Sequence, residues 1–167
     1  TESSFTTCDE SGNFSENFDT LTSGQIPSCW SRIIGSTYAS VGASTTNNTA
    51  PNSISLYNDS ATATTNTMLI TPAISNLGAG TNRLRFFAKN STASQDIEVG
   101  TMSNPADAST FTVLQAIDIN TTWAEYNVSF ASYTGTNKYI ALRRLSTSTY
   151  TNVYIDGVNW EAITAVA

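Results

Sequence analysis

RLRFFAKN, residues 83–90, is the stretch that decides the fold class of this chain. Its side chains alternate in two sets, which are Leu84, Phe86 and Ala88 against Arg83, Arg85, Phe87 and Lys89. A period of two is typical of a β-strand that buries one face and exposes the other to water. We therefore expect this strand to lie in a sheet that packs on one side only.

Eight further stretches have the same character and are bounded by Gly, Pro, Asn or Ser/Thr clusters. They are SENFD (15–19), SISLYN (53–58), MLITPAI (68–74), DIEVGTM (96–102), FTVLQAI (111–117), EYNVSFA (125–131), KYIALRRL (138–145) and NVYIDGVNW (152–160). Nine short strands without a convincing helix predict an all-β sandwich. The Ser/Thr/Asn-rich segment from Gly35 to Asn66 is either a long ordered loop or a pair of irregular edge strands, and long loops in compact domains tend to be functional or mobile.

Composition narrows the class of protein. The chain has 167 residues, enough for one domain, and only 12% of them are charged. Ser, Thr and Asn fill the polar positions, as in many secreted β-proteins, so we expect an extracellular or cell-surface location. A net charge of −6 argues against nucleic acid as a partner. No run of about 18 apolar residues is present, so membrane insertion is not expected.

Two cysteines and the absence of histidine carry separate consequences. In a secreted protein, Cys8 and Cys29 either form a disulfide or are two unrelated thiols. The lack of histidine excludes Ser-His-Asp and Cys-His catalysis and histidine-ligated zinc.

A family resemblance follows from the order of several motifs. They are ENFD (16–19), IPSCW (26–30), MLITPAI, RLRFFAKN, YIALRR (139–144) and YIDGVNW (154–160). Together they resemble the jelly-roll cleaved-adhesin modules of secreted Bacteroidetes proteins, including those attached to gingipain proteases, and are similar in layout to MAM domains. The resemblance covers about residues 13–162 and implies a jelly-roll β-sandwich of two antiparallel sheets.

The N-terminal segment resembles a different module. SFTTC, which ends at Cys8, looks like the last strand of a fibronectin type III domain. This resemblance implies that residues 1–10 are the tail of an upstream domain and that residues 11–167 form the jelly-roll binding module. We expect a monomer that is tethered to other domains.

Two acids lie between bulky apolar neighbours. Strict alternation places Glu16 between Phe14 and Phe18, and Asp156 on one face with Tyr154, Val158 and Trp160. A buried ionised acid costs several kcal/mol unless it is paired. The first and last strands of jelly rolls commonly run side by side, and related modules carry structural calcium. We therefore predict a structural calcium ion held by Glu16, Asp156 and Asp19 or Asn17. The alternative is that a bulge turns each acid to solvent.

The basic and aromatic residues predict a binding surface. Arg85, Phe87 and Lys89 share one exposed face, and Tyr139 and Arg143 share another. If both faces belong to one sheet, they form a surface that suits an anionic polysaccharide, with Trp123 in a turn as a further sugar platform. Alternatively, these cations pair with Glu98 or Glu125 and serve only solubility.

Catalysis is not expected. The candidate acids Glu98, Asp107 and Glu125 occur singly on separate strands or turns, whereas glycoside hydrolysis needs two carboxylates that flank one bond. We therefore predict a non-catalytic carbohydrate-binding module of a secreted multidomain protein. The alternatives are an adhesin domain that binds host or matrix protein and a spacer without a ligand.

Overall fold

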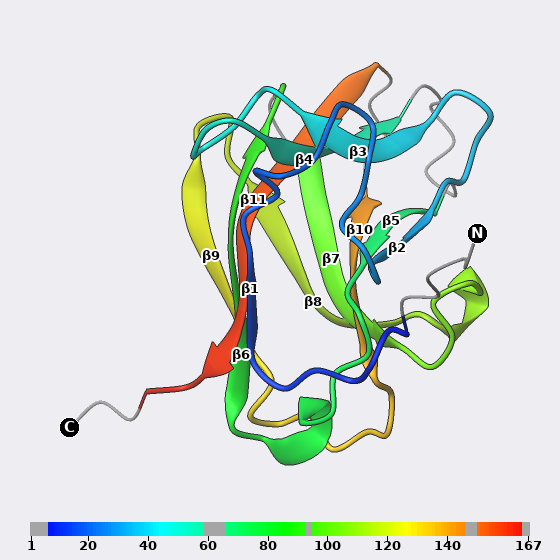
Figure 1. Ribbon diagram of the computed structural model, residues 1–167, viewed down its shortest axis with the longest axis vertical. Helices are drawn as coiled ribbons and strands as arrows, with labels where there is room; N and C mark the ends of the chain where they lie inside the picture. The colour runs from blue at the N-terminus through cyan, green and yellow to red at the C-terminus, as the bar shows by residue number, and fades with distance from the viewer. Residues whose placement is uncertain (1–6, 59–65, 93–94, 146–149, 165–167) are drawn as a thin grey trace, which may run out of the picture.

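The computed structural model describes residues 7–58, 66–92, 95–145 and 150–164. It shows a sandwich of two antiparallel sheets that pack face to face (Figure 1). The predicted all-β jelly-roll fold is confirmed. Within the described residues, helix is limited to two three-residue 3-10 turns, η1 (Leu77–Ala79) and η2 (Ala108–Thr110), and no helix has the length and apolarity needed to cross a membrane.

The larger sheet has six strands in the order β3-β4-β11-β6-β9, with β1 also paired to β11. These strands are β1 (Phe14–Glu16), β3 (Ser40–Ser44), β4 (Ser53–Asn58), β6 (Asn82–Asn90), β9 (Ala124–Ser129) and β11 (Thr151–Ala162). The register Phe14↔Trp160 sets β1 beside the end of β11, so the first and last strands are neighbours, as predicted.

The smaller sheet has five strands in the order β2-β5-β10-β7-β8. They are β2 (Ser31–Ile33), β5 (Thr67–Ile70), β7 (Gln95–Met102), β8 (Thr112–Ile119) and β10 (Tyr139–Leu145). Its outer face carries a second, smaller apolar cluster of Met68, Ile70, Met102 and Ala141. The side chain of Phe111, next to η2, packs on this cluster, so part of this outer face is covered by the chain itself.

The core lies between the sheets and follows the alternation in the sequence. Leu84, Phe86 and Ala88 of β6 are fully buried, and Ile140 and Leu142 of β10 face them from the other sheet. Trp30 is 8% exposed and Trp160 is fully buried, so both belong to the core. Trp160 packs edge-on against Phe130 with 5.0 Å between ring centroids.

A β-bulge in β11 corrects the predicted alternation of NVYIDGVNW. The pairing with β6 shifts register between Asp156 and Asn159, and Gly157 adopts φ 54°, a left-handed conformation that favours glycine. Residues before the bulge follow one alternation and residues after it the other. Tyr154 therefore lies on the outer face, whereas Val158 and Trp160 point into the core.

Two strands were not recognised as such in the sequence. β2 has only three residues and forms one edge of the smaller sheet, and β3 falls within the segment from Gly35 to Asn66. The described part of that segment holds β3 paired with β4, which agrees with the edge-strand alternative.

The N-terminal segment is tied to the sandwich. Cys8 and Cys29 form a disulfide, which settles the alternative left open by the sequence. Glu10 forms an ion pair with Lys138, and the backbones of Ser11 and Ile74 form an isolated parallel β-bridge. Residues 1–6, which include most of the predicted fibronectin type III tail, lie outside the described residues, and the division at residue 10 stays a prediction.

Candidate functional site

The outer face of the six-stranded sheet gathers aromatic side chains from three strands and from the residue that precedes a fourth. The residues of this aromatic face are Tyr57 of β4, Tyr154 of β11, Phe87 and Lys89 of β6, and Trp123 just before β9. Each is partly exposed. The neighbours of these residues along the strands, such as Leu56, Ile155 and Ala88, are buried in the core, so the alternation of a β-strand turns the aromatic face outward.

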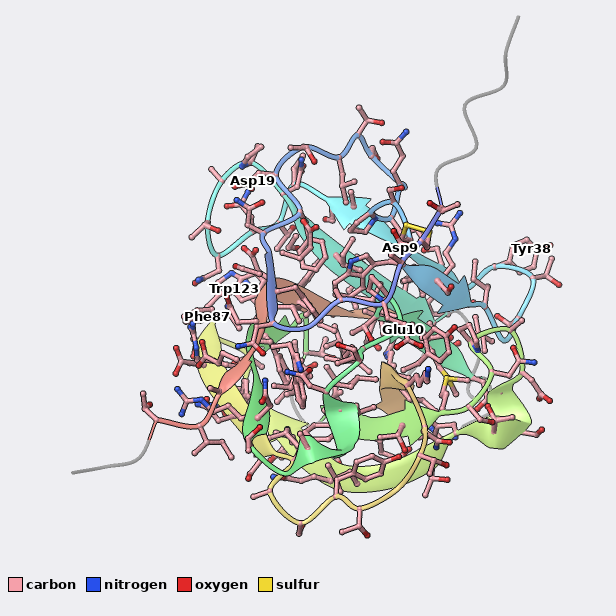
Figure 2. The ribbon with its side chains drawn as sticks, turned by 60° about the horizontal axis from the view of Figure 1, so that its bottom comes forward. Asp9, Glu10, Asp19, Tyr38, Phe87 and Trp123 are labelled. Atoms are coloured by element: carbon pink, nitrogen blue, oxygen red, sulfur yellow. A yellow bond between two sulfur atoms is a disulfide. The ribbon has the colours of Figure 1, made fainter. Side chains whose placement is uncertain are left out.

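Register brings three of the five residues, Tyr154, Lys89 and Trp123, together. Tyr154 lies opposite Lys89, and Ala124 lies opposite Ala88, which sets Trp123 beside Lys89. The rings of Trp123 and Tyr154 are 6.5 Å apart between centroids and inclined at 49°. Figure 2 shows Trp123 and Phe87 on the same side of the molecule, with Tyr38 on the opposite side. Inclined, partly exposed rings offer flat apolar surfaces to a ligand with C–H groups.

The bulge in β11 supports this arrangement. The ring of Phe87 lies only 3.4 Å from the position that a Cβ atom of Gly157 would occupy. The ring of Phe87 thus packs beside Gly157 at ordinary van der Waals distance. The left-handed backbone of the bulge is what favours glycine at position 157.

The other end of the same outer face is a closed ion-pair network. Glu161 accepts hydrogen bonds from Arg83 Nη2 at 2.8 Å and from Arg85 Nε at 3.0 Å, and Arg85 Nη1 lies 3.4 Å from Glu125. The hydrogen bond from Arg85 holds the pKa of Glu161 below its ordinary value and raises the pKa of Arg85. Arg85, a predicted ligand contact, is thus already engaged with carboxylates.

Tyr139 and Arg143 lie on the other sheet, so the condition that both basic faces belong to one sheet is not met. The two outer faces look away from each other across the core, and no single ligand can lie across both. Arg143 Nε donates to Glu98 at 2.7 Å, and the guanidinium lies 4.4 Å from the centre of the Phe111 ring. Tyr139 packs against the smaller apolar cluster. Tyr139 and Arg143 therefore help to cover the apolar cluster on the outer face of the five-stranded sheet.

A polar groove of about 500 Å³ opens at the β3 edge of the six-stranded sheet. Its lining consists of Ser23, Gly24, Arg32, Ile34, Ser40, Val41, Gly42, Ala43, Ser44, Thr45 and Ser55. Most of these side chains are small or carry hydroxyl groups, and Arg32 is the charged residue among them. The sequence pattern did not single out this groove, because it is formed by a short edge strand and a loop distant from it along the chain.

Two of the three predicted metal ligands, Asp156 and Asp19, contact one loop, residues 45–52. Asp156 is fully buried, and its Oδ2 accepts hydrogen bonds from the backbone N–H groups of Asn48 and Thr49, both at 2.9 Å. Asp19 Oδ1 lies 3.4 Å from Asn52 N, and Glu16 Oε1 accepts from Phe18 N at 2.7 Å. The alternative that a bulge exposes Asp156 is wrong, because the bulge is present and the side chain stays buried.

These contacts define what a cation would find there. Among the described residues, no three acidic, histidine or cysteine side chains are grouped closely enough to hold a metal ion by themselves. A calcium ion held by Glu16, Asp19 and Asp156 would need backbone carbonyls for most of its 6–8 oxygen ligands. In favour of such an ion, Asp19 and Asp156 both contact the loop of residues 45–52, and the described residues place no ion pair on any of the three carboxylates. Calcium binding stays a prediction.

The remaining acids considered for catalysis have structural partners. Glu98 binds Arg143 on the five-stranded sheet, and Glu125 binds Arg85 on the six-stranded sheet. Asp107 accepts hydrogen bonds from Ser109 Oγ at 2.7 Å and from Ser109 N at 2.9 Å at the start of η2, and these two hydrogen bonds lower the pKa of Asp107. The three carboxylates lie on separate elements, so no two of them flank a common site.

The fold is shared with solved binding domains. No family model matches the sequence, and no curated protein matches it. One cleaved adhesin domain of Lys-gingipain superposes with a TM-score of 0.69 at 17% identity, over 89% of this chain and 97% of that domain. A second, from Porphyromonas gingivalis, gives 0.67 at 20% identity, over 92% and 100%.

A carbohydrate-binding domain is also similar. The CBM22-1 xylan-binding domain of Xyn10C from Paenibacillus barcinonensis superposes with a TM-score of 0.57 at 13% identity, over 95% of this chain and 99% of that domain. Identities this low establish the fold alone. The resemblance to cleaved-adhesin modules that the motifs indicated is thus confirmed as a shared jelly-roll architecture.

Proposed function

We propose that this protein is a non-catalytic carbohydrate-binding module and that its ligand lies on the aromatic face of the six-stranded sheet. The observation that carries the proposal is the pair of inclined, partly exposed rings of Trp123 and Tyr154 with Lys89 between them. Sugar rings present C–H faces that pack on aromatic surfaces. The similarity to a domain described as xylan-binding supports the same reading.

An anionic polysaccharide remains the preferred ligand, although the structure changes the residues that would contact it. Arg85 and Arg143 are engaged with carboxylates, whereas Lys89 stands within the aromatic face, and the described residues offer it no ion pair. Lys89 therefore supplies the positive charge for a carboxylate or sulfate group. Binding through Lys89 weakens as salt rises, because exposed charges are screened beyond about 8 Å at physiological ionic strength.

Affinity gel electrophoresis tests the proposal, with neutral, carboxylated and sulfated polysaccharides cast in separate gels. We expect at least one polysaccharide to retard the wild-type protein and the Trp123→Ala substitution to weaken retardation about tenfold, equivalent to about 1.4 kcal/mol. Arg143→Ala, on the opposite sheet, is the matched control and should bind as the wild type does. Retardation that survives Trp123→Ala but not Arg143→Ala would move the site to the other sheet.

The second candidate function, adhesion to host or matrix protein, is favoured by the similarity to cleaved adhesin domains. Tyr38, which is 76% exposed, provides an apolar contact on the side of the molecule opposite Trp123 and Phe87. Solid-phase binding to collagen and fibronectin separates the two functions. Binding to either protein that is lost in Tyr38→Ala and kept in Trp123→Ala would favour the adhesin.

A further inference from the structure

The polar groove at the β3 edge lies in line with the aromatic face. Register pairs Gly42 with Ser55, Ser55 with Tyr154, and Tyr154 with Lys89. Residues opposite one another in neighbouring strands share a face of the sheet. The floor of the groove, Gly42 and Ser55, is therefore the continuation of the row that leads through Tyr154 and Lys89 to Trp123.

The loop that carries Gly24 forms one wall of the groove and lies against β3 at Gly42. A Cβ atom on Gly42 would lie 2.5 Å from the carbonyl oxygen of Gly24, whose loop runs over β3. Gly24 N donates to Ala43 O at 3.0 Å, and Ala43 N donates to Gln25 O at 2.8 Å, so this loop is fixed against the strand edge. The surrounding hydroxyl groups of Ser23, Ser40 and Thr45 are suited to the hydroxyl groups of a sugar.

Arg32 brings a fixed positive charge to this groove. Its Nη1 donates to Gly24 O at 2.9 Å and to Val41 O at 2.6 Å, so two backbone carbonyls orient the guanidinium. The side chain is exposed, and the described residues provide no partner for Nε or Nη2. An oriented guanidinium with open N–H groups is the geometry that binds a carboxylate or sulfate by two hydrogen bonds.

The ion pairs or burial of the other cations distinguish Arg32 of the groove and Lys89 of the aromatic face from the rest. Of the seven Lys and Arg residues, four form ion pairs, namely Arg83, Arg85, Lys138 and Arg143, and Arg144 is buried. Arg32 and Lys89 are left without a carboxylate partner in the described chain. In a protein of net charge −6, these two positions are where a polyanion finds attraction rather than repulsion.

We propose that the groove and the aromatic face form one track for a linear acidic polysaccharide, with Arg32 and Lys89 as its two anion contacts. This inference rests on the proposed function and extends it. The track crosses the strands from β3 to β9, four strand spacings or about 19 Å, so it takes several sugar units. A short ligand can occupy the aromatic face alone, whereas a longer one reaches Arg32.

The test compares ligand length and groove charge. Titration calorimetry with oligogalacturonides of increasing length examines carboxylates, and a matching series of sulfated oligosaccharides examines sulfates. Ser40→Glu adds a negative charge at an exposed position that lines the groove, and Ser40→Gln is the uncharged control of similar size. In the acidic series that binds, we expect Ser40→Glu to weaken the long oligomers about tenfold, to leave the shortest unchanged, and Ser40→Gln to match the wild type.

The outcomes separate the track from the proposed function. If long acidic oligomers bind Ser40→Glu as tightly as the wild type while Trp123→Ala abolishes binding, the track is wrong and the aromatic face stands. If only neutral xylan binds and depends on Trp123, the acidic ligand is wrong. If Trp123→Ala leaves all binding intact, the proposed function fails, and the track fails with it.

Discussion

Asp156 shows how a single residue determines the local structure around the loop of residues 45–52. Its carboxylate is fully buried and accepts two backbone N–H groups of the loop, Thr49 Oγ1 at 3.4 Å and its neighbour Gly157 N at 2.8 Å. Hydrogen bonds to an ionised acceptor are stronger than those between neutral groups and offset much of the cost of burial. Asp156, an acid between apolar neighbours in the sequence, thus holds the loop of residues 45–52 in place through hydrogen bonds.

Calcium dependence is the first prediction at this scale. If calcium binds among Glu16, Asp19 and Asp156, an excess of calcium about 100-fold over its Kd should stabilise the fold by about 2.7 kcal/mol, and a chelator should remove this stabilisation. Glu16→Gln should abolish the response, and Glu125→Gln should keep it. Calorimetric melting measures the effect, and curves that ignore both calcium and chelator would exclude the site.

At the scale of the element, β6 and β11 show what alternation alone can predict. The burial of Leu84, Phe86 and Ala88 follows directly from the period of two in RLRFFAKN. The burial of Val158 and Trp160 does not follow from strict alternation in NVYIDGVNW. The bulge at Gly157 reverses the alternation within this strand, and the bulge depends on pairing with β6. Strand periodicity thus predicts faces only until a bulge intervenes.

The sequence likewise predicted some residues of the candidate site and missed others. Phe87, Lys89 and Trp123 lie on one outer face, as their positions in the sequence allowed, and Tyr154 joins them because β11 lies beside β6. The sequence could not assign β6 and β10 to different sheets, because sheet membership depends on long-range pairing. For the same reason Arg32, from the edge of the smaller sheet, was not predicted to line a groove on the larger one.

The ion-pair network between β6 and β11 makes a prediction about pH. The pKa of Glu161 is lowered in the folded state, chiefly by its hydrogen bond with Arg85. A carboxyl group whose folded pKa is depressed contributes stability above its ordinary value of 4.5, and this contribution is lost as pH falls through the folded pKa. Stability of the wild type should therefore fall more steeply below pH 4.5 than that of Glu161→Gln.

At neutral pH, the same Glu161→Gln substitution should destabilise the fold by about 1 kcal/mol, since the pairs are partly exposed and screened by solvent. Denaturant unfolding between pH 3 and pH 7, roughly the range over which glutamate titrates, measures both effects. Arg83→Gln, which keeps the Arg85 pair, should show a smaller change. Parallel pH curves for wild type and Glu161→Gln would contradict the role of the network.

For the whole molecule, the disulfide fixes the N-terminal segment to the sandwich. Cys8 and Cys29 are 21 positions apart, and closing a loop of this size contributes roughly 3 kcal/mol in loop-entropy models. The double substitution Cys8→Ser with Cys29→Ser should lower the free energy of unfolding by up to about that amount. Denaturant unfolding with and without reductant checks it, and two free thiols on titration of the denatured, unreduced protein would rule the disulfide out.

The sandwich presents two outer faces of different character. On the five-stranded sheet, Phe111 and Arg143 cover an apolar cluster, whereas on the six-stranded sheet rings and a lysine remain partly exposed. Because Phe111 packs on the apolar cluster of the five-stranded sheet, that outer face exposes less aromatic surface to a ligand. This asymmetry is why the central claim places carbohydrate on the six-stranded sheet.

Tryptophan fluorescence tests that claim most directly. Trp30 and Trp160 are in the core and Trp123 is on the aromatic face, so the difference between wild type and Trp123→Phe isolates the emission of Trp123. Titration with a polysaccharide that retards the protein should shift this emission, and the binding curve should match that from calorimetry. Saturable binding of carbohydrate that leaves the emission of Trp123 unchanged would contradict the account.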